Sequence, residues 1–309
     1  MIGLRNILLA ASTNAWLRER ATKSAFIRRS VSAFMPGERL EDGLAAASKE
    51  SALGIKSILT KLGENVTRVE DAEDITRHYL DALDRIKAPG LPAQISVKPT
   101  QLGLDLDVEL CFANLQRLLD RAAERETFVW IDMESSGYVD RTLDLFRRSR
   151  ARSSRIGVAL QAYLHRTEAD LESLLPLGPA VRIVKGAYLE PPSVAFRKKA
   201  DVDANFYKLC CRVLGASAPA GSLLHIATHD EQLVNRLAAF IDERRVPAST
   251  YEHAMLYGIQ QPLQRRLARA QRPLRVLISY GDYWFPWYMR RLAERPANLW
   301  FVVKSIFAR

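Results

Sequence analysis

The chain has 309 residues, of which 48% are hydrophobic and 26% are charged, a composition typical of a globular protein with a core of enzyme size. Forty-five basic residues against 35 acidic ones leave a net charge of +10, which favours an anionic substrate, an anionic membrane surface or nucleic acid without choosing among them. The three cysteines lack metal-ligand spacing and no apolar run reaches the roughly 18 residues of a membrane span, so we expect a reduced cytoplasmic protein without zinc, disulfides or a membrane span.

The first thirty or so residues are basic and amphipathic, with six Arg or Lys residues and only Glu19 against them. This pattern fits a packing helix, a helix on a membrane surface or a transit peptide. Pro36 and Gly37 end the segment, and residues 40–53 are predicted to form one more helix before the pattern changes. We therefore divide the chain into a helical N-terminal extension, residues 1–50, and a main domain, residues 51–309.

From about residue 54 onward, strand-like runs alternate with stretches of helical periodicity. The runs start about 25 to 40 residues apart, which is the length of a strand plus a crossover helix. About eight such units predict an α/β fold, a (βα)8 barrel; a doubly wound open sheet is the alternative, but no Gly-rich dinucleotide turn supports it. The runs begin near residues 54, 93, 128, 157, 181, 222, 249 and 275.

Polar residues stand at or near the last position of six of these strands, after mostly apolar starts. Active sites of such barrels lie at the carboxyl ends of the strands, and alternation along each strand allows the terminal side chains to point inward. One such residue alone would be read as a strand cap, but six together predict a site. They are Lys98, Asp132, Gln161, Lys185, His229 and Glu252.

The run VRIVKGAY, residues 181–188, holds Arg182 inside a β-branched strand and has Lys185 and Gly186 at its exit. An unpaired buried cation costs several kcal/mol, so Arg182 must meet a carboxylate, a phosphate or a polarised cofactor. Glycine at position 186 allows a backbone to come close to that ligand.

The segment 281–305 is dense in aromatic and basic residues. In a helix, Glu294 would lie beside the adjacent Arg290 and Arg291, since it follows them by four and three positions. Two guanidinium groups suit a planar carboxylate. Taken alone, however, such a segment is more often a solvated helix face than a site.

Four motifs, VRIVKGAY, HIATHD, YEHAMLYGI and YMRRLAERPAN, occur in that order and resemble the proline dehydrogenase family. The resemblance runs from about Gly54 to the C-terminus, and the basic helical N-terminus is similar to that of the short, monofunctional bacterial members. It implies a distorted (βα)8 TIM-like barrel that holds FAD noncovalently, oxidises L-proline to pyrroline-5-carboxylate and passes the electrons to a membrane quinone, as the first step of proline catabolism. The second step would belong to a separate pyrroline-5-carboxylate dehydrogenase, for which a transient contact is expected.

By motif, the resemblance implies that Arg290 and Arg291 bind the proline carboxylate together with Lys98. Asp132 and Glu294 would be the ion-pair partners that hold these cations in place. The remaining substrate positions would shape the pocket for the proline ring, and they are Leu256 and Tyr288.

The resemblance also assigns the FAD contacts. Arg182 would lie beside the hydride-accepting nitrogen of the flavin, where a cation stabilises the reduced anionic form. The other positions would contact the flavin edge, the phosphates and the ribose or adenosine part. They are Gln161 at the flavin edge, Val184, Lys185, Gly186 and Ala187 along the dinucleotide, Thr228 and His229 at the phosphates, Glu252 on the ribose or adenosine side, and Phe301 near the flavin.

Two other classes of function remain open. One is a barrel lyase or aldolase that uses Lys185 as a Schiff base, and the other is a non-catalytic basic protein that binds nucleic acid or a membrane through its charge. Under the leading interpretation we expect no nucleic-acid partner. The basic N-terminal helices and the need for a quinone lead to the hypothesis of peripheral contact with the inner face of the cell membrane.

Overall fold

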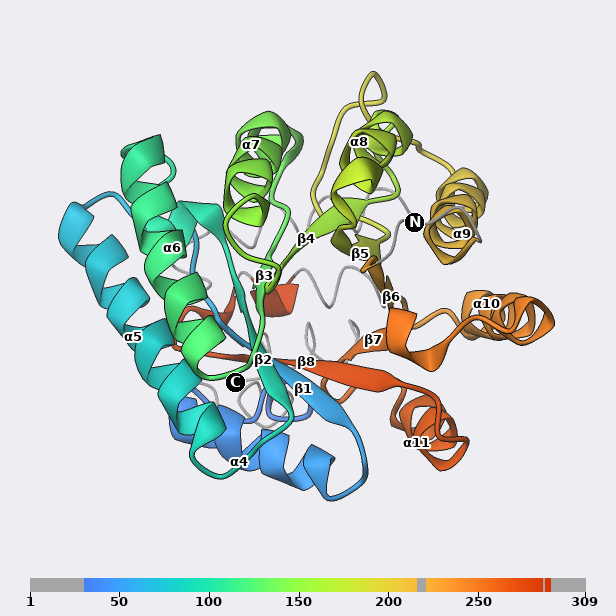
Figure 1. Ribbon diagram of the computed structural model, residues 1–309, viewed down its shortest axis with the longest axis horizontal. Coiled ribbons are helices and arrows are strands. Elements are labelled where there is room, and N and C mark those ends of the chain that lie inside the picture. Colours follow the sequence, from blue (N-terminus) through green and yellow to red (C-terminus); the bar gives the residue numbers. More distant parts are fainter. Residues whose placement is uncertain (1–30, 216–220, 286, 290–309) are drawn as a thin grey trace, which may run out of the picture.

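Eight parallel strands close into a barrel, with each strand pairing with the next along the chain and β8 pairing with β1 (Figure 1). The computed structural model describes residues 31–215, 221–285 and 287–289. All eight predicted strands are present, and the predicted (βα)8 TIM-like barrel is confirmed. The strands are β1 (Lys56–Lys61), β2 (Ala93–Val97), β3 (Val129–Ile131), β4 (Ile156–Gln161), β5 (Ala180–Val184), β6 (Leu223–Ala227), β7 (Tyr251–Leu256) and β8 (Leu274–Tyr280).

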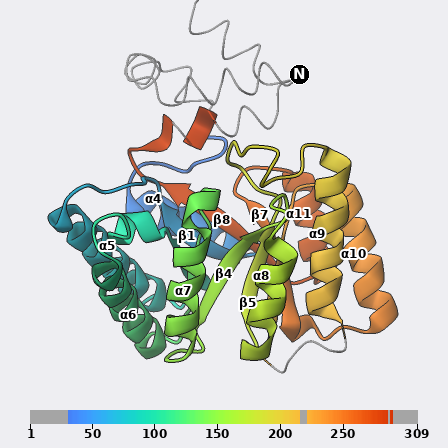
Figure 2. The same ribbon diagram turned by 90° about the horizontal axis from the view of Figure 1, so that it is seen from above.

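Helices cover the outside of the barrel (Figures 1 and 2). The first of the described helices, α4 (Leu40–Ser51), precedes β1 and packs against β1 and β8. It falls within the predicted N-terminal extension, and the division of the chain at residue 50 stays a prediction. The helices that follow β1 to β7 are α5 (Val69–Lys87), α6 (Val108–Glu124), α7 (Val139–Arg150), α8 (Thr167–Leu174), α9 (Lys199–Leu214), α10 (Glu231–Arg244) and α11 (Gln261–Arg269).

The main core lies between the strands and these helices. Outward-facing apolar residues of the strands, such as Ile95, Val158 and Ile183, are fully buried there. The helices bury one stripe each, because their apolar residues recur every three or four positions. In α10, for example, Leu233, Leu237 and Ile241 are buried. None of the described helices is both long and apolar enough to cross a bilayer.

A smaller core fills the inside of the barrel around Trp130 of β3. The indole ring has room because the neighbouring strand carries Gly157, where an added Cβ would lie 2.5 Å from a ring carbon. Trp130 Nε1 donates a hydrogen bond of 2.7 Å to Gln94 of β2. The ring therefore separates the amino end of the barrel from the carboxyl end, where the candidate site lies.

Candidate active site

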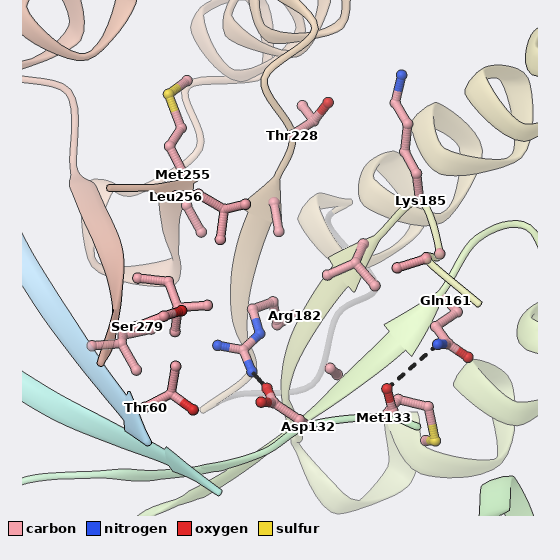
Figure 3. Close-up of a pocket in the computed structure, with 18 of the residues that line it drawn as sticks. Thr60, Asp132, Met133, Gln161, Arg182, Lys185, Thr228, Met255, Leu256 and Ser279 are labelled. Carbon is pink, nitrogen blue, oxygen red and sulfur yellow. Dashed lines mark hydrogen bonds and ion pairs between the residues drawn. The ribbon is translucent and has the colours of Figure 1, made fainter. Parts of the chain in front are cut away.

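A cavity of about 470 Å³ lies at the carboxyl end of the barrel, and each of the eight strands, or the loop that follows it, contributes to its wall (Figure 3). This is the end at which barrel enzymes carry their active sites. Most of the predicted site residues line this cavity. They are Lys98, Asp132, Gln161, Arg182, Val184, Lys185, Gly186, Ala187, Thr228, His229 and Leu256.

The prediction for Glu252 was wrong. Glu252 was expected at or near the end of the strand that starts near residue 249, but β7 spans Tyr251–Leu256 and Glu252 is its second residue. Its carboxylate lies at the amino end of the barrel, where it contacts Arg275 at 2.5 Å and Lys56 at 2.8 Å. A contact with a dinucleotide at the opposite end is therefore excluded for this residue.

Of the five predicted residues that remain, only Tyr288 belongs to the described part of the chain. Tyr288 is buried, with its ring centroid 6.2 Å from that of Trp284. The other four lie outside the described residues, so their roles stay predictions; they are Arg290, Arg291, Glu294 and Phe301.

Arg182 lies inside the barrel and points toward Asp132 (Figure 3). Its Nη2 donates to Asp132 Oδ1 and to the hydroxyl of Ser96, 2.8 Å away. Burial lowers the pKa of the Arg182 guanidinium, and the Asp132 carboxylate opposes this shift, so the group stays a cation. The other terminal nitrogen, Nη1, is buried and has no hydrogen-bond partner among the described residues.

Lys98 brings a second cation to the same carboxylate. Its Nζ lies 3.9 Å from Asp132 Oδ2, and its side chain is only 11% exposed. The sequence predicted Asp132 as a partner of Lys98 but did not predict its stronger contact with Arg182. The two cations together make this wall of the cavity positive, which suits an anionic or electron-rich ligand.

Gln161 ends β4 and presents its amide to the cavity. Nε2 donates to the carbonyl oxygens of Glu134, at 3.1 Å, and Met133, at 3.4 Å (Figure 3). Its Oε1 is buried and finds no partner within the described part of the chain. Because an unsatisfied buried polar atom costs about 1–3 kcal/mol, the acceptor of Gln161 and the donor of Arg182, both without a partner among the described residues, indicate that the cavity binds a polar ligand.

Lys185 extends away from Arg182 and Asp132 (Figure 3). Its Nζ lies 2.6 Å from Asp203 and 3.0 Å from Asp230, and Lys199 contacts the same two carboxylates. This network joins the exit of β5 to the beginnings of α9 and α10. An amine held by two carboxylates is not arranged as a Schiff-base nucleophile.

His229 fixes the neighbouring strand ends. Its Nε2 accepts a hydrogen bond of 2.8 Å from the backbone nitrogen of Leu256, so a neutral ring carries its proton on Nδ1. Thr228 Oγ1 accepts a hydrogen bond from the backbone nitrogen of Asp230 at 3.1 Å. These contacts set the rim of the cavity at β6 and β7.

Small residues give the cavity its depth. Ala159, Ala227 and Ala254 line it from β4, β6 and β7, and Gly186 lies at the exit of β5. The remaining wall is mostly apolar, which is typical of a small-molecule site with a few placed polar groups. This part of the wall includes Met255, Leu256, Leu277 and Trp287.

The predicted site lacked several polar lining residues, including Thr60, Ser279 and Asp230. Thr60 and Ser279 lie at the carboxyl ends of β1 and β8, and the strand-end pattern that found Lys98 could also have found them. Asp230 follows His229 directly and forms the N-cap of α10, accepting a hydrogen bond from Leu233. An aspartate between a strand end and a helical pattern is a detectable capping signal.

The fold and the site together define a (βα)8-barrel enzyme with a small-molecule pocket at its mouth, into whose wall Arg182 and Lys98 bring buried cations. The family model described as proline dehydrogenase matches residues 44–304, which is most of the chain. The chain therefore belongs to the proline dehydrogenase family.

Individual relatives agree with this assignment. Proline dehydrogenase 1 of Bacillus subtilis (strain 168) is 33% identical over 306 residues, covering 99% of this chain and 100% of that protein. A proline dehydrogenase of Deinococcus radiodurans is 34% identical over 278 residues, 88% of each chain. Among solved structures, proline utilization A from Bdellovibrio bacteriovorus, inactivated by N-propargylglycine, has a TM-score of 0.82 at 20% identity; the match covers 99% of this chain and 37% of that chain, and supports the fold alone.

Proposed function

We propose that this protein is a FAD-dependent proline dehydrogenase that oxidises L-proline to pyrroline-5-carboxylate and delivers the electrons to a membrane quinone. The observation that carries the proposal is that two residues lining the cavity of a chain from this family each have a buried polar atom, Arg182 Nη1 and Gln161 Oε1, without a partner among the described residues. One is a donor and the other an acceptor. A flavin ring edge offers both kinds of partner, so the residues present fit the group.

Several residues would hold the cofactor. Arg182 and Gln161 would bind the flavin ring, and Ala159, Ala227 and Ala254 leave space for a planar ring system. Residues 184–187, Thr228 and His229 would support the rest of the dinucleotide at the rim. When bound, FAD would supply the acceptor for the hydride that leaves proline.

The chain's own residues bind and orient the substrate. Lys98, with the predicted help of Arg290 and Arg291, would hold the proline carboxylate, and Asp132 keeps Lys98 in place. Leu256, Met255 and Leu277 would exclude water from the reacting carbon. Oxidation removes a hydride from the carbon next to nitrogen and a proton from the nitrogen, leaving a C=N bond, so a neutral amine is required and no strong protein base is needed.

The purified holoenzyme tests this proposal. We expect a yellow protein whose flavin absorbance bleaches on anaerobic addition of L-proline and recovers on addition of a quinone. The rate constant for flavin reduction should rise with pH until the substrate amine is deprotonated. A colourless protein, or a bound flavin that proline does not bleach, would contradict the proposal.

Arg291→Ala tests the predicted carboxylate site. We expect a large rise in the proline concentration required for half-maximal rate, with flavin content unchanged. Lys49→Ala, on the exposed side of α4, serves as a control for the loss of one positive charge. An unchanged proline requirement in Arg291→Ala would remove this residue from the site.

We also propose that the basic segment 1–30 brings the protein to the inner face of the membrane, where the quinone lies. Deletion of residues 1–30 should reduce cosedimentation with anionic liposomes while proline still bleaches the flavin. Equal cosedimentation of the full and shortened chains would exclude this segment as the anchor.

A further inference from the structure

We propose that Ser96 is a positioning residue that fixes the direction in which Arg182 presents its free guanidinium edge. The inference rests on the proposed function, since it concerns how the protein holds a cation against the flavin. Ser96 lies on β2 inside the barrel and has no exposed surface. It does not line the cavity and would touch neither substrate nor cofactor.

Three side chains form a closed triangle of hydrogen bonds. Arg182 Nη2 donates to Ser96 Oγ at 2.8 Å and to Asp132 Oδ1, while Ser96 Oγ donates to the same Asp132 oxygen at 2.8 Å. A carboxylate can only accept, so the single hydroxyl proton of Ser96 goes to Asp132, and its lone pair faces Arg182. This assignment satisfies all three groups at once.

Asp132 alone would not fix the arginine. Its side chain is 20% exposed at the cavity, and its other oxygen lies 3.9 Å from Lys98, so the carboxylate is shared between two cations. Ser96 is held more firmly, because it pairs with Trp130 in the sheet and its carbonyl accepts a hydrogen bond of 3.1 Å from Tyr79. The buried Ser96 hydroxyl therefore sets the orientation of the Arg182 guanidinium.

Trp130 completes the support from another direction. The Cζ atom of Arg182 lies 5.2 Å from the centroid of the Trp130 ring, within cation–π range. Nη2 is held by Ser96 and Asp132 and the guanidinium packs on the ring, whereas Nη1 is buried and left without a partner among the described residues. Its direction toward the ligand follows from the other contacts.

The expected consequence is electrostatic. A guanidinium held in one position beside the flavin would stabilise its reduced form, and a guanidinium that samples several conformations would stabilise it less. For Ser96→Ala we expect the equilibrium constant for flavin reduction to fall about tenfold, which is about 30 mV for a two-electron couple. The rate constant for reduction by proline should fall with it, while the proline concentration for half-maximal rate changes little, because Ser96 makes no substrate contact.

Ser57→Ala provides a matched control. Ser57 is also buried in the sheet, on the adjacent strand β1, but its hydroxyl has no hydrogen-bond partner within the described ranges. Both variants lose a buried hydroxyl from the sheet, but Ser57 alternates with Ile58 and Thr60 of the cavity wall and therefore faces the outside of the barrel. Only Ser96→Ala should lower the reduction potential of the bound flavin.

The test measures this potential by dye equilibration in the wild-type, Ser96→Ala, Ser96→Cys and Ser57→Ala holoenzymes. The thiol of Ser96→Cys has the same shape as the hydroxyl, is somewhat larger and is a weaker hydrogen-bond partner, so an intermediate shift of the reduction potential is expected. If Ser96→Ala does not fold, the comparison of Ser96→Cys with wild type tests the inference. Wild-type potentials in both Ser96 variants, or an equal shift in Ser57→Ala, would overturn the inference. A wild-type protein without a proline-reducible flavin would instead refute the proposed function, so the two failures are distinguishable.

Discussion

Arg182 shows how a barrel can keep one charged group available for a ligand in a largely dry interior. Burial disfavours its charged form, and Asp132, Ser96 and Trp130 offset that cost on one side only. Its Nη1 has no hydrogen-bond partner in the part of the chain that the structure describes. A residue of this kind binds more strongly to a ligand than a solvated arginine would, because no water has to be removed from the bonding edge.

Glu134 is a second buried ionisable residue near the cavity, and its pKa leads to a prediction. Its carboxyl accepts hydrogen bonds from the backbone and the hydroxyl of Thr100, at 3.1 and 2.7 Å. Burial raises the pKa of Glu134 to about 7 despite these bonds. The unfolded chain releases this proton near 4.5, so the contribution of Glu134 to stability falls as pH rises from about 4.5 to 7 and is constant above that.

Glu134→Gln removes this dependence. We expect the variant to gain stability relative to wild type between pH 5 and pH 8, by at most about 3 kcal/mol, because the neutral amide pays no charge-burial penalty at high pH. Urea unfolding at the two pH values measures the change, and Glu168→Gln, an exposed glutamate on α8, is the control. The assignment fails if the stability difference between Glu134→Gln and wild type is the same at both pH values.

At the scale of elements, the loop between β5 and α9, residues 185–198, is fastened on two sides of the cavity. The Glu190 carboxylate accepts hydrogen bonds from the backbone and the hydroxyl of Ser136, at 2.7 and 2.6 Å, in the loop after β3. Farther along, the backbone of Phe196 donates to the carbonyl of Tyr163, after β4, at 2.8 Å. Residues 185–188, which precede the first attachment, line the cavity. Figure 2 shows the loops of this region above the carboxyl end of the barrel.

Glu190→Ala should release one attachment of this loop. We expect faster loss of the bound flavin and a several-fold rise in the proline requirement, with a change in unfolding free energy below about 1 kcal/mol, because the contact is on a partly exposed loop. Flavin dissociation on dilution and steady-state kinetics measure the two effects. Glu168→Ala breaks a surface pair with Lys208 on α8 and α9 and should leave both unchanged; the same behaviour in the two variants would show that the attachment has no role.

Gly186 is the point at which this loop leaves β5. Its φ is +112°, and a Cβ there would lie 2.2 Å from the ring of Tyr163, whose backbone nitrogen is bonded to the Lys185 carbonyl. Gly186→Ala should therefore displace the loop, destabilise the protein by a few kcal/mol and prevent flavin retention. Gly90→Ala has a positive φ but open space around the added methyl, so it measures the backbone strain alone. Equal unfolding free energies for the two variants would mean that the contact with Tyr163 relaxes without cost.

Sequence reasoning succeeded for these elements where the signal is local. Each strand is an apolar run with a polar exit, which is why Lys98, Asp132 and Gln161 were placed correctly at the cavity. It failed for Glu252, because the run that begins near residue 249 does not show by itself where pairing in the sheet begins and ends: β7 spans Tyr251–Leu256, so Glu252 lies near its amino end. Strand boundaries depend on pairing with neighbours that the local sequence does not contain.

At the scale of the whole molecule, the side chains at the amino end of the barrel join strands to one another, and those at the carboxyl end form the candidate site. At the amino end, Arg275 donates to Glu252 and to the carbonyl of Ser57, joining β7, β8 and β1. At the carboxyl end, Arg182 and Lys98 meet at Asp132, and Arg182 Nη1 has no partner among residues 31–215, 221–285 and 287–289. The contacts that build these clusters join residues 50 and 218 positions apart, and for this reason the sequence predicted that Arg182 needs an anion but not which one.

The cluster of Glu252, Arg275 and His225 at the amino end of the barrel leads to the last prediction. Burial raises the pKa of Glu252, but contacts with His225 and Arg275 outweigh it and hold the pKa well below its usual range. Burial lowers the pKa of His225 to about 4, so the imidazole is neutral near pH 7 and Arg275, with Lys56, supplies the compensating charge. The Glu252–Arg275 pair therefore stabilises the fold above the unfolded glutamate pKa of 4.5, and this contribution is lost as the pH falls below that value.

Arg275→Met leaves the Glu252 carboxylate buried without its main partner, and we expect a loss of about 3–5 kcal/mol at pH 7 that becomes smaller as pH is lowered and the carboxyl takes up a proton. The double variant Arg275→Met/Glu252→Gln should recover most of this loss, because it removes both charges rather than one.

Urea unfolding of the three proteins at pH 7 and pH 5 measures the free energies of unfolding. The flavin content of the folded variants should equal that of wild type, since the cluster lies at the end of the barrel away from the cavity. A double variant no more stable than the single one would show that the two side chains are not energetically coupled. Loss of flavin from folded Arg275→Met would show that the two ends of the barrel are not independent.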